Sequence, residues 1–118
     1  MIGASSNQLR PSNDVFRYLR AVGYDVVPVN PGETDVDGVP CYPTLAEAVA
    51  ATGPVELVDV FRRSELCPPH AHEAVAVGAR CLWLQLGIVS VEAAETAVAG
   101  GLSVVMDRCT KIERARLV

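Results

Sequence analysis

A regular alternation of apolar runs with segments of helical period is the feature that most constrains this chain. Four runs rich in β-branched residues are expected to form strands, over residues 25–30 (DVVPVN), 55–61 (VELVDVF), 80–86 (RCLWLQL) and 102–107 (LSVVMD). The segments between them carry helical spacing and end near glycines, which predicts helices over residues 14–22, 45–51, 68–77 and 91–99. Such alternation indicates right-handed βαβ units. We therefore expect an α/β fold, a Rossmann-like doubly wound parallel sheet in three layers.

The size and charge of the chain limit what it can bind. Its 118 residues suit a single domain over residues 1–118, and a net charge of −4 argues against broad nucleic-acid binding. A small phosphorylated ligand needs only a local group of donors and stays compatible with that charge. No apolar run reaches the length of a membrane span, and residues 1–5 do not resemble a secretory signal, so we expect a cytoplasmic protein without membrane contact.

The first loop, Gly3-Ala4-Ser5-Ser6-Asn7, is the strongest candidate for a phosphate site. A glycine directly after a strand lets the backbone approach a ligand, and the following N–H and hydroxyl groups are suitable donors. Arg10 and Ser12 follow at the start of a helix and add a cation and a hydroxyl. An ordinary turn between a strand and a helix would have the same composition. Only two residues precede Gly3, so we expect the first strand to be truncated here and further apolar residues to lie upstream in the natural chain.

Later strand ends supply further candidates, because the carboxyl ends of parallel strands meet at one edge of a sheet. The first run ends with Pro28, Val29 and Asn30, at the place where a dinucleotide-binding protein carries an acid. The absence of that acid and of a GxGxxG sequence argues against an NAD dehydrogenase. The other strand-end candidates are Phe61, Arg62, Gln85 and Gly87. Each of these positions is also compatible with a plain turn or a solvated side chain.

The cysteines and histidines do not assemble a recognisable catalytic or metal centre. Cys67, His70 and His72 lack a fourth ligand, and the two histidines fall on different faces of the expected helix. Cys109 follows the last strand and is expected to border the site, but no histidine lies near it in the sequence to act as a base. All four cysteines are expected to be reduced thiols, and Trp83 is expected to lie in the core.

Six segments in order carry a resemblance to a known family. They are GASSNQLRPS (residues 3–12), GYDVVPVNPG (23–32), YPTL (42–45), VDVFRR (58–63), LWLQLGI (82–88) and VVMDRCTKIE (104–113). Together they resemble the CoA-binding protein family typified by small bacterial YccU-like proteins, which is similar in turn to the CoA-binding domain of the succinyl-CoA synthetase alpha subunit. The resemblance implies coenzyme A as the ligand. It implies that Gly3, Ser5, Ser6, Asn7 and Arg10 lie around the phosphates, Pro28, Val29 and Asn30 near the adenosine, and Phe61 and Arg62 along the next strand end. No segment matches the synthetase domain that carries a phosphorylated histidine, so the synthetase reaction is not expected.

These observations predict a stand-alone, non-catalytic module that binds coenzyme A or an acyl-CoA, without a metal. Two alternatives stay open: a small acyl- or redox-transfer enzyme that uses Cys109, and a protein-interaction module with a vestigial nucleotide pocket. Exposed edge strands make a homodimer compatible with the fold.

Overall fold

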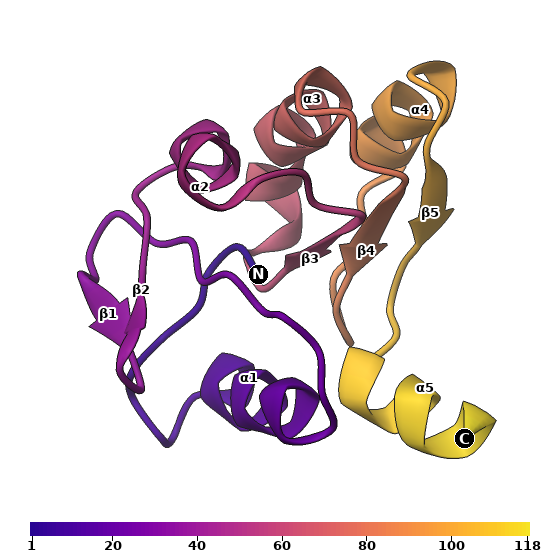
Figure 1. The fold of residues 1–118 in the computed structure, drawn as a ribbon. Coiled ribbons are helices and arrows are strands. Elements are labelled where there is room, and N and C mark those ends of the chain that lie inside the picture. The colour runs from indigo at the N-terminus through magenta and orange to yellow at the C-terminus, as the bar shows by residue number, and fades with distance from the viewer.

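A parallel sheet forms the centre of the computed structural model, which describes residues 1–118 (Figure 1). Strands β3 (Leu57–Val60), β4 (Cys81–Leu84) and β5 (Ser103–Val105) pair in parallel in the order β3-β4-β5. Single parallel bridges extend this sheet beyond β3, because Ile2 bridges both Val60 and Val29, and Val29 also bridges Tyr42.

The extended sheet has the strand order of a Rossmann-like fold. Across the sheet, the segments around Tyr42, Val29 and Ile2 precede β3, β4 and β5. If these six segments are numbered by their order along the chain, their order across the sheet is 3-2-1-4-5-6, which is the order found in dinucleotide-binding folds. The order in which strands are added to the sheet reverses between the Ile2 segment and β3, and ligands of such folds bind beside that point.

The segment that precedes Gly3 is short but is bonded on both sides. Gly3 N–H donates to the Val29 carbonyl at 2.9 Å, and Ile2 N–H donates to the Asp59 carbonyl at 2.8 Å. The first loop is therefore anchored in the sheet even though few residues precede it. The expected strand over residues 25–30 reduces to the bridge at Val29, since Pro28 lacks the N–H that would continue pairing toward residues 40–42.

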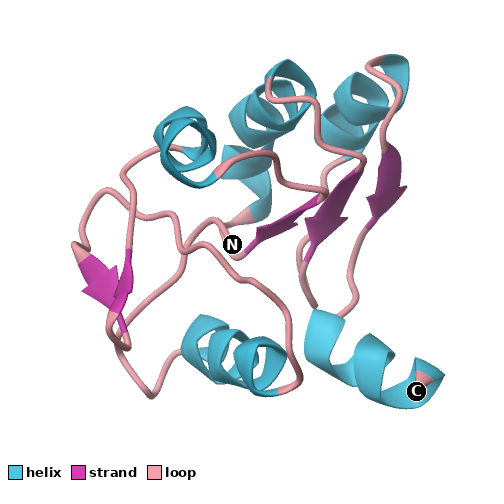
Figure 2. Ribbon diagram, in the orientation of Figure 1, coloured by secondary structure: helices cyan, strands magenta, loops and turns pink.

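The helices form two groups in the view of Figures 1 and 2. Helices α2 (Leu45–Thr52), α3 (Cys67–Ala76) and α4 (Val91–Ala99) lie together, and α1 (Pro11–Ala21) and α5 (Thr110–Leu117) lie at the other side of the drawing. Small buried residues line α3 and α4, which lets these helices pack closely. They are Ala71, Ala74, Ala93 and Ala97. The largest buried side chains of the sheet, Leu82 and Leu84, pack in the same cluster.

Side-chain caps explain where two of the predicted helices begin. Thr44 Oγ1 accepts from Glu47 N–H at 3.1 Å before α2, and Ser90 Oγ accepts from Ala93 N–H at 3.1 Å before α4. Helix α1 begins earlier than expected, because Pro11 occupies its first turn, where a missing N–H costs nothing.

Three features differ from the sequence-based expectation. Helix α5 was not predicted, nor was the antiparallel hairpin of β1 (Asp35–Val36) and β2 (Val39–Pro40). That hairpin turns at Asp37-Gly38, both with positive φ, and an Asp-Gly pair is a recognised hairpin sequence. Trp83 is only half-buried, and its Nε1–H donates to the Arg108 carbonyl at 2.7 Å, so its assignment to the core was wrong.

Candidate functional site

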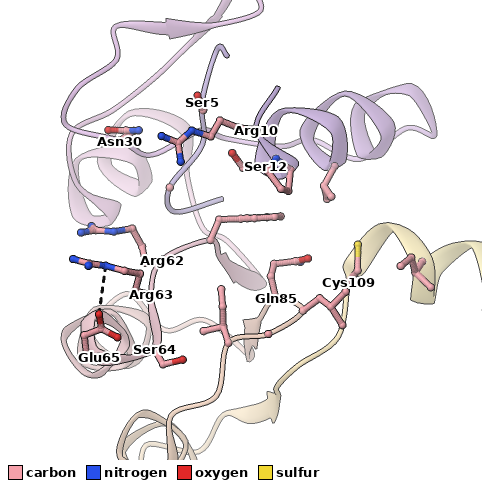
Figure 3. Close-up of a pocket in the computed structure, with 18 residues that line it drawn as sticks. Ser5, Arg10, Ser12, Asn30, Arg62, Arg63, Ser64, Glu65, Gln85 and Cys109 are labelled. Atoms are coloured by element: carbon pink, nitrogen blue, oxygen red, sulfur yellow. Dashed lines mark ion pairs between the residues drawn. The ribbon is translucent and has the colours of Figure 1, made fainter. Parts of the chain in front are cut away.

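A cleft of about 810 Å³ opens at the carboxyl ends of the strands, beside the point where the sheet reverses direction (Figure 3). The first loop and the start of α1 form one wall, the segments after β3 and β4 form the floor, and the start of α5 closes one side. Its lining residues are Gly3, Ser5, Arg10, Pro11, Ser12, Val15, Asn30, Phe61, Arg62, Arg63, Ser64, Glu65, Gln85, Leu86, Gly87, Ile88, Cys109 and Ile112.

The charge of the cleft is opposite to that of the whole chain. Arg10, Arg62 and Arg63 line it, and Glu65 is the one acidic residue among its lining residues. Arg63 Nε lies 3.4 Å from Glu65 Oε1, but both side chains are largely exposed, so this pair neutralises little. No carboxylate pairs with Arg10 or Arg62. In the view of Figure 3 the three arginines lie toward one end of the cleft, and Gln85 and Cys109 lie toward the other.

Gly3 has a structural role that accounts for its place in the loop. Its φ of 83° lies in the left-handed region, and a Cβ at this position would overlap the carbonyl group of Phe61. Its N–H is already bonded to Val29. The glycine therefore brings the first loop against the end of β3, rather than offering its own N–H to a ligand.

The other groups of the first loop divide into bonded and available donors. Ser6 N–H and hydroxyl both donate to the Glu33 carboxylate, at 2.7 and 2.9 Å. Asn7 N–H donates to Ser5 Oγ at 3.1 Å. The backbone N–H groups of Ala4 and Ser5 have no hydrogen-bond partner, and the Ser5 hydroxyl proton is also free. Ala4 is fully buried and lines neither hollow, so Ser5 is the residue whose free N–H and hydroxyl can meet an anion beside the arginines.

Two asparagines hold the loop in place. Asn30 Nδ2 donates to the Ala4 carbonyl at 2.7 Å, while its Oδ1 accepts from Gly32 N–H at 2.8 Å. Asn13 Nδ2 donates to the Ser5 carbonyl at 2.8 Å. Because the carbonyls of Ala4 and Ser5 are tied from two sides, the loop is preorganised. Both ends of the Asn30 amide are thus engaged in positioning the loop and the turn that follows Asn30.

Beneath the floor of the cleft, Asp59, Gln85 and Thr110 form a closed hydrogen-bond network. Asp59 is only 4% exposed, and burial raises the pKa of its carboxyl group from 3.8 to about 6. The hydrogen bond from Gln85, the Met1 amino group and the hydrogen bond from Thr110 oppose that rise in pKa. The network ties β3 and the end of β4 to the first residue of α5.

A second hollow of about 380 Å³ adjoins the cleft. It shares Gly3, Asn30 and Arg62 with the cleft. Its remaining lining residues are Ile2, Val29, Pro31, Pro43, Thr44, His70 and Glu73. His70 Nδ1 lies 2.6 Å from Glu73 Oε1, which fixes the orientation of the imidazole ring.

The structure brings most of the predicted site residues together. Nine line the cleft: Gly3, Ser5, Arg10, Ser12, Asn30, Phe61, Arg62, Gln85 and Gly87. Val29 lines the second hollow instead. Ala4 and Pro28 have fully buried side chains, and Ser6 and Asn7 lie exposed outside both hollows. Gly87 N–H is occupied by Asp107 Oδ1 at 2.7 Å.

Several lining residues were missed by sequence reasoning. Arg63 and Ser64 directly follow Arg62 in the segment after β3 and were not among the site residues predicted there. Leu86 and Ile88 flank Gly87 in the same way. Ile112 lies on α5, which was not predicted at all. Cys109 lines the cleft, as expected from its place after the last strand.

Metal-binding groups and reactive thiols are sparse around the site. No three His, Cys, Asp or Glu side chains gather in a group that could hold a metal ion. All four cysteines are free, and burial raises the pKa of the Cys41, Cys67 and Cys81 thiols. Cys109 is the only one of the four that lines the cleft.

A Rossmann-like order of strands, with a cation-lined cleft where the order reverses, is typical of proteins that bind phosphorylated cofactors. The family described as "CoA binding domain" matches residues 1–115, and the chain belongs to that family. A Bacillus subtilis (strain 168) protein, uncharacterized protein YneT, is 36% identical over 115 residues, which cover 98% of this chain and 83% of that protein.

Solved structures agree with this assignment. A hypothetical protein from Pyrococcus horikoshii OT3 superposes with a TM-score of 0.92 at 36% identity, covering 98% of this chain and 80% of the other. A Thermus thermophilus protein gives 0.91 at 35% identity, covering 99% of this chain and 87% of the other. None of the helices is both long and apolar enough to span a membrane.

Proposed function

We propose that this chain is a stand-alone, non-catalytic module that binds coenzyme A or an acyl-CoA in the cleft. The observation that carries the proposal is the group of three cleft arginines in a chain of net charge −4, two of them without a carboxylate partner. Guanidinium groups bind phosphate oxygens in a fixed fork, and the free N–H and hydroxyl of Ser5 add donors beside them. Membership of the CoA binding domain family supports coenzyme A as the phosphorylated ligand.

The proposed orientation of the ligand follows the distribution of charge. The phosphates lie near Ser5, Arg10 and Arg62, and the adenosine extends past Asn30 toward Val29 and the second hollow. The pantetheine arm runs over Phe61 and Gln85 toward Cys109, where the lining contains Leu86, Ile88 and Ile112. In this arrangement four of the predicted site residues support the loop and the sheet, and their side chains do not contact the ligand. They are Ala4, Ser6, Asn7 and Pro28.

The broader proposal places this module in a single doubly wound, three-layered domain over residues 1–118. The separation of α1 and α5 from α2, α3 and α4 supports that layering (Figure 1). We also propose a cytoplasmic location and allow for a homodimer paired through an exposed sheet edge.

Ligand binding is favoured over acyl or redox transfer by the composition of the cleft. Cys109 is its only thiol, and no histidine lines it to activate that thiol. His70 lines the second hollow and is paired with Glu73.

Isothermal titration and thermal unfolding with CoA, acetyl-CoA, NAD and ATP test the proposal. A ligand at a hundredfold excess over its Kd should add about 2.7 kcal/mol of stability. Arg62→Met should weaken CoA binding by about tenfold or more, because a charged hydrogen bond is lost. The control Arg80→Met changes an exposed arginine that lines neither hollow and should leave binding unchanged. If the chain binds no CoA species, the proposal is wrong, and a protein-interaction role takes its place.

A further inference from the structure

The orientation of the Gln85 side-chain amide is fixed from below the cleft. Gln85 is 3% exposed, and its Nε2 donates to Asp59 Oδ1 at 2.5 Å and to Thr110 Oγ1 at 2.9 Å. The Thr110 hydroxyl in turn donates to Asp59 Oδ2 at 2.9 Å. Both amide protons and the hydroxyl proton are therefore used within the network.

Chemistry allows only one orientation of this amide while Asp59 is ionised. An ionised carboxylate accepts hydrogen bonds and donates none, so the NH₂ group of Gln85 must face Asp59. Turning the amide over would place Oε1 against a buried carboxylate and lose two hydrogen bonds. Asp59 and Thr110 thus determine which end of the amide meets the cleft.

The end that remains is a free acceptor in the cleft. No protein group donates to Gln85 Oε1. Arg114 Nε is the only side-chain nitrogen or oxygen that is both fully buried and without a hydrogen-bond partner, so the unpaired Oε1 of Gln85 is not fully buried. Since Oε1 is unpaired and not fully buried, it keeps contact with the solvent of the cleft that Gln85 lines. A ligand that displaces this solvent must supply a donor, or Oε1 loses its hydrogen bond.

We propose that Gln85 Oε1 accepts a hydrogen bond from an amide N–H of the pantetheine arm, with Asp59 and Thr110 as the positioning residues. This inference rests on the proposed CoA function. The pantetheine arm carries two secondary amides, each with one N–H. Its secondary hydroxyl lies next to the phosphates, which the arginines hold at the far end of the cleft from Gln85 (Figure 3), and its thiol or thioester end has no comparable donor. Gln85 therefore selects the arm by its amides and sets its position along the cleft.

A change in the ligand tests the inference without changing the protein. Wild-type binding is measured by titration calorimetry for CoA and for two CoA analogues, each with one of the pantetheine amide nitrogens methylated. One analogue should bind about tenfold more weakly, the loss expected for one unsatisfied hydrogen bond. 3′,5′-ADP, which lacks the arm, serves as the reference for the phosphate end. Equal affinity for CoA and both analogues overturns the inference.

A variant then shows that Gln85 is the acceptor. Gln85→Met should weaken CoA by a similar factor, leave 3′,5′-ADP unchanged, and abolish the difference between CoA and the sensitive analogue. Gln8→Met is the matched control, because Gln8 is exposed and lines neither hollow. If Gln85→Met still distinguishes that analogue, another group accepts the N–H and the inference is wrong.

Asp59→Asn tests the positioning role and covers a failure of Gln85→Met to fold. An asparagine can donate to Oε1, so the Gln85 amide can turn over, and CoA should weaken while 3′,5′-ADP does not. Equal effects on both ligands would indicate a general structural defect and contradict the positioning role. A wild-type chain that binds neither CoA nor 3′,5′-ADP would refute the proposed function itself, whereas normal CoA binding without these differences would refute only the role of Gln85.

Discussion

Asp59 is a buried carboxyl group whose titration should be visible in the stability of the protein. Burial raises its pKa from 3.8 to about 6 in the folded chain. The folded state therefore holds the proton more tightly than the unfolded chain does. The resulting contribution to stability is fully present below pH 3.8 and is lost as the pH rises through about 6.

The two pKa values set the size of the effect. Their separation, from 3.8 to about 6, corresponds to about 3 kcal/mol of unfolding free energy. About half of this, between about 1 and 2 kcal/mol, should appear between about pH 7.5 and pH 5, where the folded protein titrates and the unfolded chain stays ionised. Asp59→Asn removes the titration, so the stability difference between wild type and variant should shift in favour of wild type as the pH falls.

Urea unfolding of both proteins across this range measures the effect. The substitution Asp59→Asn also changes hydrogen bonds in the network. The test is therefore how the difference in unfolding free energy between wild type and variant changes with pH, and not its size at one pH. Asp25→Asn, at an exposed carboxylate, is the control and should give a pH dependence parallel to that of wild type. Parallel curves for wild type and Asp59→Asn would show that the carboxyl group is not perturbed, and the argument from burial would fail.

Three further changes test the fold and the cleft. Gly3→Ala should cost about 2 kcal/mol or more in urea unfolding, because the side chain needs a disfavoured φ and overlaps the Phe61 carbonyl; a loss below about 0.5 kcal/mol would contradict this. Ser90→Ala should cost about 1 kcal/mol through loss of the α4 cap, without changing CoA affinity. In native protein, iodoacetamide should label Cys109 faster than Cys67, and CoA should slow the labelling of Cys109 as read by peptide mass spectrometry; no protection would argue against the proposed path of the arm.

Alternation of apolar runs with helical segments was enough to predict the parallel sheet and four of its helices. Periodicity reports burial along one element, so it located β3, β4 and β5 within a few residues. It missed α5, because the sequence TKIERARL is mostly polar and shows little apolar periodicity. Periodicity also predicted too long a strand around Pro28. The pairing of that strand depends on neighbouring segments that lie elsewhere in the chain, and Pro28 lacks an N–H for it.

The candidate site was predictable in its place but not in the use of its groups. Strand-end residues such as Arg62 and Gln85 were found because parallel strands bring their carboxyl ends together. The sequence does not reveal which donors are already bonded. The Gly3 N–H is hydrogen-bonded within the sheet, and the Asn30 side chain is hydrogen-bonded to the first loop, although both residues were predicted to contact the ligand. Whether a donor is already bonded depends on tertiary hydrogen bonds, which the local sequence pattern does not encode.

Glu33 shows why the argument against NAD needs the structure as well as the sequence. Dinucleotide-binding folds place an acid at the end of the second strand to hold ribose hydroxyls. The chain has Asn30 at that point, but Glu33 follows three residues later and reaches back to the first loop. Both of its oxygens accept hydrogen bonds from Ser6, one from the N–H and one from the hydroxyl. Glu33 therefore acts as an internal anion that orders the outer part of the loop, and binding a ribose diol there would require breaking two hydrogen bonds. The free N–H group of Ser5 lies one step earlier in the same loop and faces the cleft, so a phosphate can bind there without displacing Glu33.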